Sequence, residues 1–435
     1  MIVDTDAISW SLRRVLQVCD HLSDIDYVLQ VDNRAPDIVR LTPSGMKTIP
    51  LPVALGYLRS KMPTLRYRKY SMESIREDSI VGYGYTANNR AEFRFLNALL
   101  DPTHSSGRVV NICDSPYATL SGIHGELGDL FMSSLKELLN DRASLPAGLV
   151  LQIRVLLVSL QSAASVMGSL KPHGFVVAND HSPAPVAWAG VARAFGKRVM
   201  YLQHAHVHKG FPALDFDLSI LRDRASRRAY SAIGPSQGRV VVLPRGGVWG
   251  FRGPMEIAEK RQQVRHDSGA HVVFYPSSVF DEDYLFGAVE AQLSNPSTRR
   301  VSVKLHPNSK SSLLGTLPMG ADLIESIPVD PHVAVCGNSS VVLDVLERGC
   351  LAYVDKRIDS LAPDYYGFVQ AGLCDEVLSE RAIGRWWKSQ PRSACAQVGK
   401  LARYSGTVGG ALNRLLYLWS RAKVRANLRA WGILR

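Results

Sequence analysis

The fold class follows from residues 174–204, which read GFVVANDHSPAPVAWAGVARAFGKRVMYLQH. Apolar runs at 175–178 and 198–202 predict two strands, and the segment 185–195 between them predicts a helix that closes at Gly196. Strand, helix and strand within about thirty residues are typical of a parallel βαβ unit. The stretch therefore predicts an α/β fold with a parallel sheet.

Polar side chains follow both of these strands. Asp180 comes shortly after the first strand and His204 after the second. Open α/β sheets bind their ligands beyond the carboxyl ends of the strands. We therefore expect Asp180 and His204 to lie at a ligand-binding edge.

The same pattern returns further along the chain. Further strands are predicted at 26–31, 107–113, 271–275, 300–305, 333–336 and 350–354, and further helices at 284–293 and 341–347. Residues 240–253, VVVLPRGGVWGFRG, are rich in glycine and predict a joint between two arrays. A chain of 435 residues is long enough for two hydrophobic cores. We predict two facing Rossmann-like domains with parallel sheets, at 1–240 and 241–380, followed by a basic helical segment at 381–435.

The composition is that of a globular protein. Hydrophobic residues make up 46% of the chain and charged residues 21%, a balance that allows sizeable cores. The first residues include Asp4 and Asp6 and lack the basic and apolar regions of a secretory signal. The sequence contains no run of about eighteen consecutive apolar residues, so it predicts no membrane-spanning helix. The six cysteines show no CxxC spacing, so we expect reduced thiols and a cytoplasmic protein.

The positive charge is concentrated near the C-terminus. Twelve of the 51 Lys and Arg residues lie at 381–435, where there is no Asp or Glu. The other 39 are matched by 39 acidic residues, so the net charge of +12 belongs to this one segment. The distribution argues against a nucleic-acid-binding surface and for a local anionic partner.

Two short motifs carry groups that suit a phosphate. Residues 304–307, KLHP, end one predicted strand, and residues 337–340, GNSS, join another to a helix. In a parallel sheet both motifs lie at the same edge, where a lysine, an imidazole, two hydroxyls and free backbone N–H groups can bind phosphate oxygens. Taken singly, a strand-ending turn explains the first motif and a helix cap explains the second.

Together these motifs resemble the HP and SS motifs of bacterial transferases that use CMP-activated sialic acid or Kdo, including polysialyltransferases and capsule or O-antigen Kdo transferases. The resemblance implies a GT-B glycosyltransferase that needs neither metal nor cofactor and moves an acidic sugar from a CMP-sugar to a surface polysaccharide or lipid-linked glycan. The nucleotide-binding residues that it implies are His306, Pro307, Ser339 and Ser340, with Lys304 and Asn338 in support. CDP-glycerol-type glycerophosphotransferases of teichoic-acid or capsule synthesis carry a similar arrangement and are the first alternative. A non-catalytic glycan- or nucleotide-binding protein is the second.

A transferase needs a base for the attacking hydroxyl or, with retention, a carboxylate nucleophile. Asp180 is our candidate for either role, with Glu126 as a second choice, and an N-cap of the following helix is the alternative for Asp180. His204 is expected to support catalysis by contacting the donor carboxylate or the acceptor sugar.

Other polar clusters predict less chemistry. His204, His206 and His208 lie on one side of an extended segment, but no carboxylate pair or cysteine lies beside them, so we predict no metal site. We interpret Asp281-Glu282-Asp283 as helix capping rather than as a DxD metal motif. A solvated basic helix face is predicted from Arg222, Arg224, Arg227 and Arg228. The sequence holds no GxxxxGK[ST], no GxSxG and no GxGxxG after the first strand, so kinase-like, hydrolase and NAD-dependent activities lack their usual motifs.

The last 25 residues have the pattern of an amphipathic helix. The apolar side is predicted to hold Leu412, Leu415, Leu416, Trp419, Ala422, Ala426, Ala430 and Ile433, and the opposite side Arg414, Arg421, Arg425 and Arg429. Apolar and tryptophan side chains with arginines favour attachment to an anionic membrane surface, here the inner face of the cytoplasmic membrane. Packing of this helix back onto the protein is the alternative.

Overall fold

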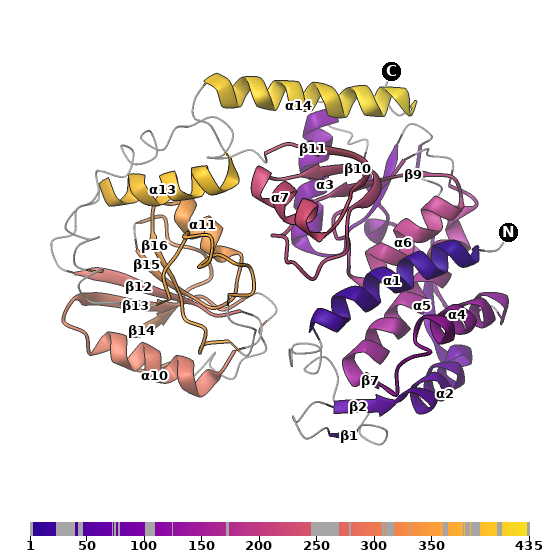
Figure 1. Ribbon diagram of the computed structural model, residues 1–435, viewed down its shortest axis with the longest axis horizontal. Helices are drawn as coiled ribbons and strands as arrows, with labels where there is room; N and C mark the ends of the chain where they lie inside the picture. Colours follow the sequence, from indigo (N-terminus) through magenta and orange to yellow (C-terminus); the bar gives the residue numbers. More distant parts are fainter. Residues whose placement is uncertain are drawn as a thin grey trace.

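The computed structural model describes residues 3–22, 40–41, 47–71, 73, 75–76, 79–100, 109–123, 125–170, 174–244, 269–277, 280–306, 309, 317–330, 332–359, 364–376, 378, 383, 392–406 and 411–432. They form two α/β domains, each with a parallel sheet, and a C-terminal pair of helices (Figure 1). The two sheets confirm the predicted α/β class.

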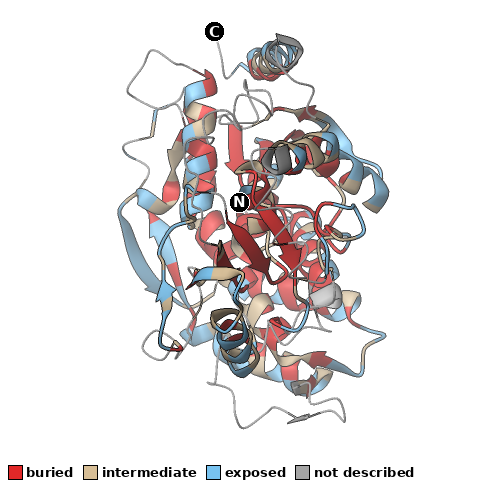
Figure 2. Cartoon of the chain, turned by 90° about the vertical axis from the view of Figure 1, so that its left-hand side faces the viewer, coloured by how far each residue is buried: buried red, intermediate tan, exposed pale blue. Residues whose placement is uncertain are grey.

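The N-terminal domain is built on a six-stranded sheet in the order β11-β10-β9-β8-β4-β5, with every pairing parallel. Its strands are β4 (Ile80–Tyr83), β5 (Val109–Asn111), β8 (Gly174–Val177), β9 (Arg198–Leu202), β10 (Asp215–Leu221) and β11 (Gln237–Val242). All four residues of β8 are buried, because helices cover both faces of the sheet. Figure 2 shows buried strands at the centre of the molecule.

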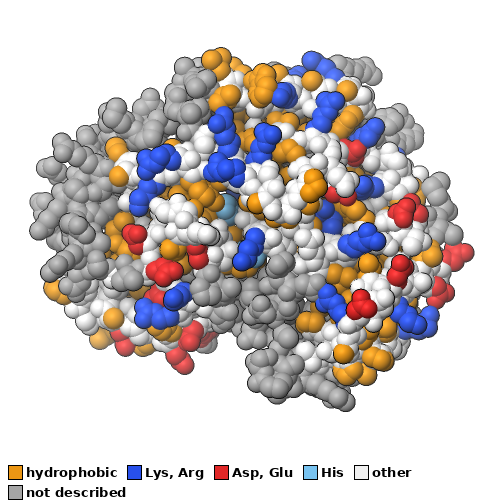
Figure 3. Space-filling view, viewed as in Figure 1, with side chains coloured by type: hydrophobic (Ala, Val, Ile, Leu, Met, Phe, Trp, Pro, Cys, Tyr) orange, Lys and Arg blue, Asp and Glu red, His pale blue; other side chains and the backbone are white. Residues whose placement is uncertain are grey.

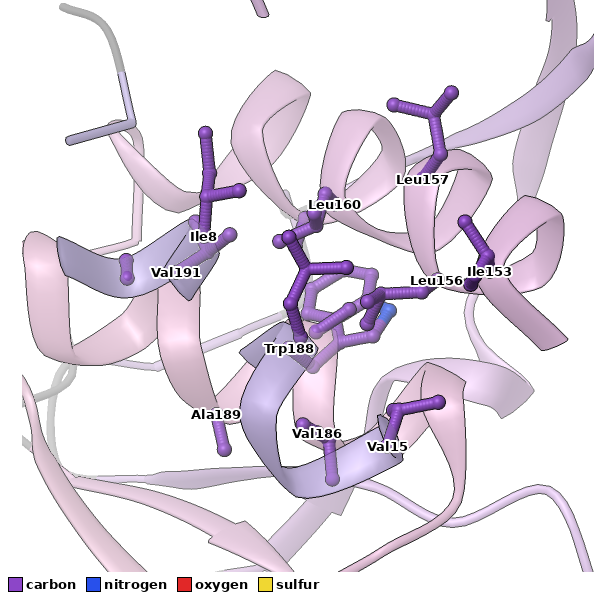
Figure 4. Packing of buried hydrophobic residues seen from close by; sticks show 14 of the residues in the cluster. Ile8, Val15, Ile153, Leu156, Leu157, Leu160, Val186, Trp188, Ala189 and Val191 are labelled. Carbon is purple, nitrogen blue, oxygen red and sulfur yellow. The ribbon is translucent and has the colours of Figure 1, made fainter. Parts of the chain in front are cut away.

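The alternation of side chains along a strand divides the residues of the sheet between two cores. Phe175 and Val177 point into the larger core with helices α1 (Thr5–Leu22), α4 (Gly125–Leu138), α5 (Ala147–Met167) and α6 (Pro183–Ala194). Val176 points to the other face, with α3 (Ala87–Leu100) and α14 (Ala411–Ala430). In the larger core, Trp188 of α6 lies among aliphatic side chains of α1, α5 and α6 (Figure 4).

Smaller elements complete this domain. They are α2 (Leu51–Lys61), α7 (Arg224–Ile233), the 3-10 turns η3 (Met62–Thr64) and η4 (Ile112–Asp114), the sheet of β1 (Arg40–Leu41), β2 (Lys47–Pro50) and β7 (Ser144–Pro146), and the antiparallel pair β3 (Arg66–Tyr70) and β6 (Tyr117–Ser121). Among the described helices, α5 alone is long and apolar enough to cross a membrane. Most of its residues are buried inside the domain against α6, α1 and β3, so we interpret it as a core helix.

The C-terminal domain has a five-stranded parallel sheet in the order β14-β13-β12-β15-β16. Its elements are β12 (Ala270–Tyr275), α10 (Glu282–Leu293), β13 (Thr298–Val303), β14 (Ala321–Leu323), β15 (Val333–Cys336), α11 (Val341–Glu347), β16 (Leu351–Val354) and α13 (Arg392–Ser405). Val272 and Phe274 face α10, whereas Val273 and Tyr275 face α11. This is again a sheet covered on both sides.

Most predicted elements are confirmed, with shifted ends. The helix predicted at 185–195 begins at Pro183, because a proline in the first turn loses no helical hydrogen bond. Gly196 has a positive φ of 68° and stops this helix, as predicted. The strand predicted at 300–305 ends at Val303. The strand predicted at 26–31 and most of the glycine-rich joint lie outside the described residues.

The C-terminal segment connects the two domains. Helix α13 packs on α11 and α7, and α14 crosses over the N-terminal domain and packs on β11 (Figure 1). Val424 and Leu428 enter the smaller core of that domain. The segment therefore packs on both domains instead of standing apart as a tail.

The predicted division of α14 into sides is partly wrong. The helix docks through Ser420, Val424 and Leu428, and Arg421 on the predicted polar side donates a hydrogen bond to the carbonyl oxygen of Leu99 at 3.4 Å. The predicted apolar side faces outward instead, with Leu415, Trp419, Ala422, Ala426 and Ala430 all exposed. The cause is tertiary: Val424 and Leu428 join the apolar cluster that the sheet forms with α3.

Candidate functional site

The carboxyl ends of the two sheets face each other. The loop after β9 carries His206, whose Nε2 lies 2.7 Å from the hydroxyl of Tyr404 in α13, and His208, whose ring stacks on Tyr365 with centroids 3.8 Å apart. A cavity of about 70 Å³ between the domains is lined by Arg222 after β10 and Ser340 after β15. Two Rossmann-like domains facing in this way form the predicted GT-B layout, and Figure 3 shows histidine at their junction.

Asp180 lies at this edge after β8, but its side chain is buried, with 1% of its surface exposed. The Tyr230 hydroxyl donates a hydrogen bond to its Oδ2 at 2.6 Å, and Nδ1 of His181 lies 2.8 Å from its Oδ1. Arg14 of α1 donates from Nε to the backbone oxygen of Asp180 at 2.9 Å and brings its Nη2 to 3.8 Å from Oδ2. Both carboxylate oxygens therefore have partners inside the protein.

These contacts keep Asp180 ionised. Burial alone would raise the pKa of its carboxyl, but the hydrogen bond and charge of His181, the Arg14 guanidinium and the Tyr230 hydroxyl hold that pKa below its ordinary value. Burial also lowers the pKa of Arg14. The pair is thus a buried charge pair with extra hydrogen bonds, which is costly to break from either side.

His181 takes a defined tautomer from this arrangement. An ionised carboxylate accepts hydrogen bonds and donates none, so Nδ1 of His181 carries the proton that lies between the ring and Asp180. The other ring nitrogen, Nε2, then has a free lone pair whenever the ring is neutral. The ring packs on Phe211 with centroids 4.1 Å apart, and the side chain keeps 20% of its surface exposed. This geometry suits a general base.

The turn that holds Asp180 and His181 is organised by Asn179. Its Oδ1 accepts hydrogen bonds from the backbone N–H of His181 at 3.0 Å and of Ser182 at 2.7 Å. Ser182, not Asp180, is the residue that precedes the helix, so the alternative that Asp180 caps α6 is wrong. The Asp180 side chain points inward because its partners Arg14 and Tyr230 lie there.

His204 stands beside this pair after β9. Burial, together with the nearby His181, lowers its pKa to about 4, although Asp180 opposes the shift. The ring hydrogen-bonds to the backbone of Ala178, and its Nδ1 is buried without a partner among the described residues. His204 is therefore neutral near pH 7 and keeps one polar atom for a ligand or water.

The other two histidines of this segment bind the domains together. His206 packs on Phe368 of the C-terminal domain with centroids 4.9 Å apart, and burial lowers its pKa to about 4. His208 accepts a hydrogen bond at Nδ1 from the backbone N–H of Gly210. Their partners include aromatic rings, the Tyr404 hydroxyl and backbone, and the described part of the chain holds no group of three metal-ligating side chains. Their contacts are thus those of an interdomain joint.

In the C-terminal domain, the predicted phosphate-binding residues lie at the ends of β13 and β15. Lys304 and His306 are half-buried after β13, and burial, with the charge of Lys304, lowers the pKa of His306. Ser339 and Ser340 are half-buried directly before α11. Asn338 is 6% exposed and leaves its Nδ2 buried without a partner among the described residues. Pro307 lies outside the described residues.

The structure adds Asp359, which sequence reasoning missed. Its carboxylate accepts hydrogen bonds from the backbone N–H of Ser277 after β12 at 3.2 Å and of Asn338 after β15. Ser309, three residues after His306, places its hydroxyl 3.4 Å from the carbonyl oxygen of Ser277. Burial raises the pKa of Asp359 to about 6. One buried carboxyl thus joins the loop after β12 to the loop of the serine pair, and Ser309 links the segment after His306 to the same loop after β12.

Gly337 makes this junction possible. A Cβ at this position would overlap both carboxylate oxygens of Asp359, so only glycine lets the backbone of residues 337–338 lie on that side chain. The sequence displayed this glycine within GNSS, but Asp359 follows it by 22 positions and carries no local signal.

Three further predictions have direct structural answers. Asp281 caps α10 by accepting a hydrogen bond from the backbone N–H of Tyr284 at 2.9 Å, which confirms the capping interpretation. Glu126 is exposed in the first turn of α4. Arg224, Arg227 and Arg228 lie on α7 as predicted, whereas Arg222 belongs to the loop after β10 because Asp223 begins the helix as its N-cap.

A chain of contacts joins the candidate residues of the two domains. The His181 ring packs on Phe211, Phe211 lies against His208, and His208 stacks on Tyr365 of the C-terminal domain. Tyr365 then donates its backbone N–H to Oδ1 of Asn338 at 2.9 Å. His181 of one domain and the serine-pair loop of the other therefore belong to one connected region.

Comparison with known proteins gives only distant likenesses. No protein-family model and no curated protein matches the sequence. Staphylococcus aureus MnaA, solved with UDP, is 12% identical over 82% of this chain and 96% of its own, with a TM-score of 0.44. The glycotransferase of kitacinnamycin is 13% identical over 62% of this chain and 81% of its own, with a TM-score of 0.41. Acinetobacter baumannii MurG is 9% identical over 79% of this chain and 99% of its own, with a TM-score of 0.37. At these values the similarities assign the chain to no family.

Proposed function

We propose that this protein is a glycosyltransferase that moves an acidic sugar, of the Kdo or sialic-acid kind, from a CMP-sugar to a surface polysaccharide or lipid-linked glycan. The observation that carries the proposal is the connected region at the facing carboxyl ends. It joins a histidine oriented by a buried carboxylate, His181, to the loop of the serine pair through Phe211, His208 and Tyr365. A base and a phosphate-binding loop on facing domains are the groups that sugar transfer from a nucleotide needs.

On the donor side, the nucleotide phosphate would lie on His306, Pro307, Ser339 and Ser340, supported by Lys304 and Asn338. The buried, unpartnered Nδ2 of Asn338 supports this placement, because such a donor needs an acceptor. Asp359 would act as a positioning residue, since it holds the backbone of Ser277 and Asn338. The donor sugar would then face the N-terminal domain.

On the acceptor side, Nε2 of His181 would take the proton of the attacking hydroxyl. The hydroxyl oxygen forms the new bond to the anomeric carbon of the donor, and the bond from that carbon to the phosphate oxygen breaks and releases CMP. Asp180 would act through His181 by holding its tautomer, because its own oxygens are buried and partnered. His204 would support the site as a neutral donor or acceptor beside them.

A thermal-shift titration with CMP, CDP, UDP, GDP and ADP tests the donor site. We expect selective stabilisation by CMP, of about 2.7 kcal/mol at a hundredfold excess over Kd, because a ligand of the native state must stabilise it. The variant His306→Ala and the double variant Ser339→Ala/Ser340→Ala should lose most of this shift. Ser297→Ala, before β13 at the opposite end of the sheet, is the matched control and should keep it.

The same titration separates the alternatives. A preference for CDP would favour the glycerophosphotransferase, and stabilisation by no nucleotide would contradict the donor site. Release of CMP from a CMP-sugar in the presence of acceptor distinguishes an enzyme from a non-catalytic binding protein, since the latter would bind CMP without turnover.

We also propose that the enzyme is cytoplasmic and attaches to the anionic inner face of the membrane through α14. The outward side of this helix exposes 62% of Leu415 and 58% of Trp419, while the helix itself carries Lys and Arg and no acidic residue. The double variant Leu415→Gln/Trp419→Gln should bind vesicles that contain phosphatidylglycerol more weakly in co-sedimentation. Val53→Gln/Leu120→Gln, two exposed apolar residues elsewhere, is the control. Equal binding by both variants would contradict this attachment.

A further inference from the structure

A cavity of about 520 Å³ lies between α7 and α14, outside the site described above. One wall is basic and is formed by Arg222, Arg224, Arg227 and Arg228. The other wall is apolar and aromatic and includes Leu416, Tyr417 and Trp419 of α14. In Figure 3, Lys and Arg side chains gather next to α14 on the upper part of the molecule. A cavity with walls of this kind suits an amphiphilic anion.

The arginines of the basic wall outnumber the acidic residues that the structure describes near them. Arg224, Arg227 and Arg228 are three and four positions apart on α7, a spacing that brings like charges together and destabilises a helix. The carboxylate of Asp223, which also lines the cavity, accepts the backbone N–H of Ser226 at 2.6 Å. Asp344 of α11 also interacts with the charge of Arg222, so two carboxylates face four guanidinium groups. The wall therefore has an excess of positive charge that an anion would offset.

Two of the four arginines, Arg224 and Arg227, have free donors. Arg222 donates to the carbonyl oxygen of His204 and Arg228 to that of Tyr404. Arg224 and Arg227 are exposed, and neither guanidinium has a hydrogen bond or an ion pair with any residue that the structure describes. A guanidinium presents paired N–H groups that match phosphate oxygens, which makes phosphate the anion that fits best.

The apolar wall continues onto the surface of α14. Leu415 and Trp419 are exposed there, and Lys423 places its Nζ 3.5 Å from the centre of the Trp419 ring. A hydrocarbon chain that leaves the cavity along this side would cover both apolar residues. The basic and apolar walls together thus fit a phosphate with a lipid tail better than a free nucleotide or sugar.

The cavity also adjoins the candidate donor site. Arg222 and Asp223 line it, and the same two residues line the small interdomain cavity that Ser340 faces. A phosphate bound on α7 would therefore hold an attached glycan beside the cleft between the domains.

We propose that this cavity binds the phosphate of a lipid-linked acceptor, with the phosphate on Arg224 and Arg227 and the lipid chain along Leu415 and Trp419. The inference rests on the proposed glycosyltransferase function, for which it names the acceptor class. It assigns the basic face of α7 to substrate binding instead of to general solvation.

The test is co-sedimentation of the full-length protein with three kinds of vesicle: phosphatidylcholine alone, and phosphatidylcholine with an equal charge of either phosphatidylglycerol or a polyprenyl phosphate. We expect the tightest binding to the polyprenyl phosphate. Arg224→Gln/Arg227→Gln should weaken that binding about 30-fold, through the loss of two phosphate-facing charges. Arg66→Gln/Arg299→Gln removes two exposed arginines that line neither cavity and is the matched control.

Equal binding to phosphatidylglycerol and polyprenyl phosphate, or equal loss in both double variants, would overturn the inference, because the attraction would then be to surface charge alone. Stabilisation by CMP is measured in parallel on each variant. If that shift persists while the lipid selectivity is absent, this inference fails and the proposed function stands. If the shift is absent from the unmodified protein, the proposed function itself fails.

Discussion

His181→Ala is expected to lower the rate of sugar transfer by about 10²- to 10⁴-fold, the range for loss of a general base. Nε2 of His181 is the nitrogen left without a proton when Nδ1 donates to the buried carboxylate of Asp180, and it is the atom that we assign to the acceptor hydroxyl. The stabilisation by CMP should be unchanged, since the predicted phosphate site lies on the other domain. Initial rates of CMP release with saturating donor and acceptor measure the effect.

Ser182→Ala provides the matched control for this prediction. Ser182 is the next residue in the same turn, and its side chain makes no capping hydrogen bond to α6, so transfer should remain near that of the unmodified protein. Transfer by His181→Ala within severalfold of the unmodified rate would remove His181 from the mechanism. A loss of transfer with His181→Ala together with a loss of CMP stabilisation would instead indicate damage to the fold.

Asp180→Ala should lower the free energy of unfolding by about 3–5 kcal/mol, because it leaves the buried guanidinium of Arg14 without its charge partner and Tyr230 without its acceptor. Asp180→Asn keeps the shape and one acceptor oxygen, so its loss of stability should be smaller. It should still slow transfer, since an amide does not hold the charged and tautomeric state of His181 as a carboxylate does. Urea unfolding followed by tryptophan fluorescence measures the stability.

The contribution of Asp180 to the free energy of unfolding should depend on pH. The folded protein holds the pKa of Asp180 below its ordinary value, so the unfolded chain binds the proton more readily. The stabilising contribution of Asp180 is complete above its ordinary pKa and is lost as the pH falls through the lowered one. Asp322→Ala is the control, because its ion pair with Arg300 is exposed and should contribute less than about 1 kcal/mol. Equal losses for Asp180→Ala and Asp322→Ala would contradict a buried charge pair.

Local patterns in the sequence were enough to find most elements of the second half. The strand at 333–336 and the helix at 341–347 were predicted with their observed ends, because a buried parallel strand is a continuous apolar run and a short helix is bounded by polar and glycine residues. The edges at which Asp180, His204, His306 and Ser339 lie followed from the same patterns. Such features depend on neighbours within a few positions.

Contacts between distant residues could not be predicted in this way. Arg14 and Tyr230 lie 166 and 50 positions from Asp180, and Asp359 lies 21 positions from the backbone that it holds. The sequence indicated that Asp180 stands at an edge, but its burial, and hence the transfer of the base role to His181, depended on α1 and α7 closing over it.

The C-terminal helix α14 likewise has one feature that local sequence predicts and one that depends on tertiary contacts. Local sequence patterns were sufficient to predict that residues 411–430 form a basic helix with apolar side chains, because helix formation and charge are local properties. The side that docks depends on tertiary packing, since Val424 and Leu428 join an apolar cluster of the sheet and α3 that the helix sequence does not contain. Periodicity fixes which residues share a face of an element, whereas burial of that face depends on the shape of a surface formed by the rest of the chain.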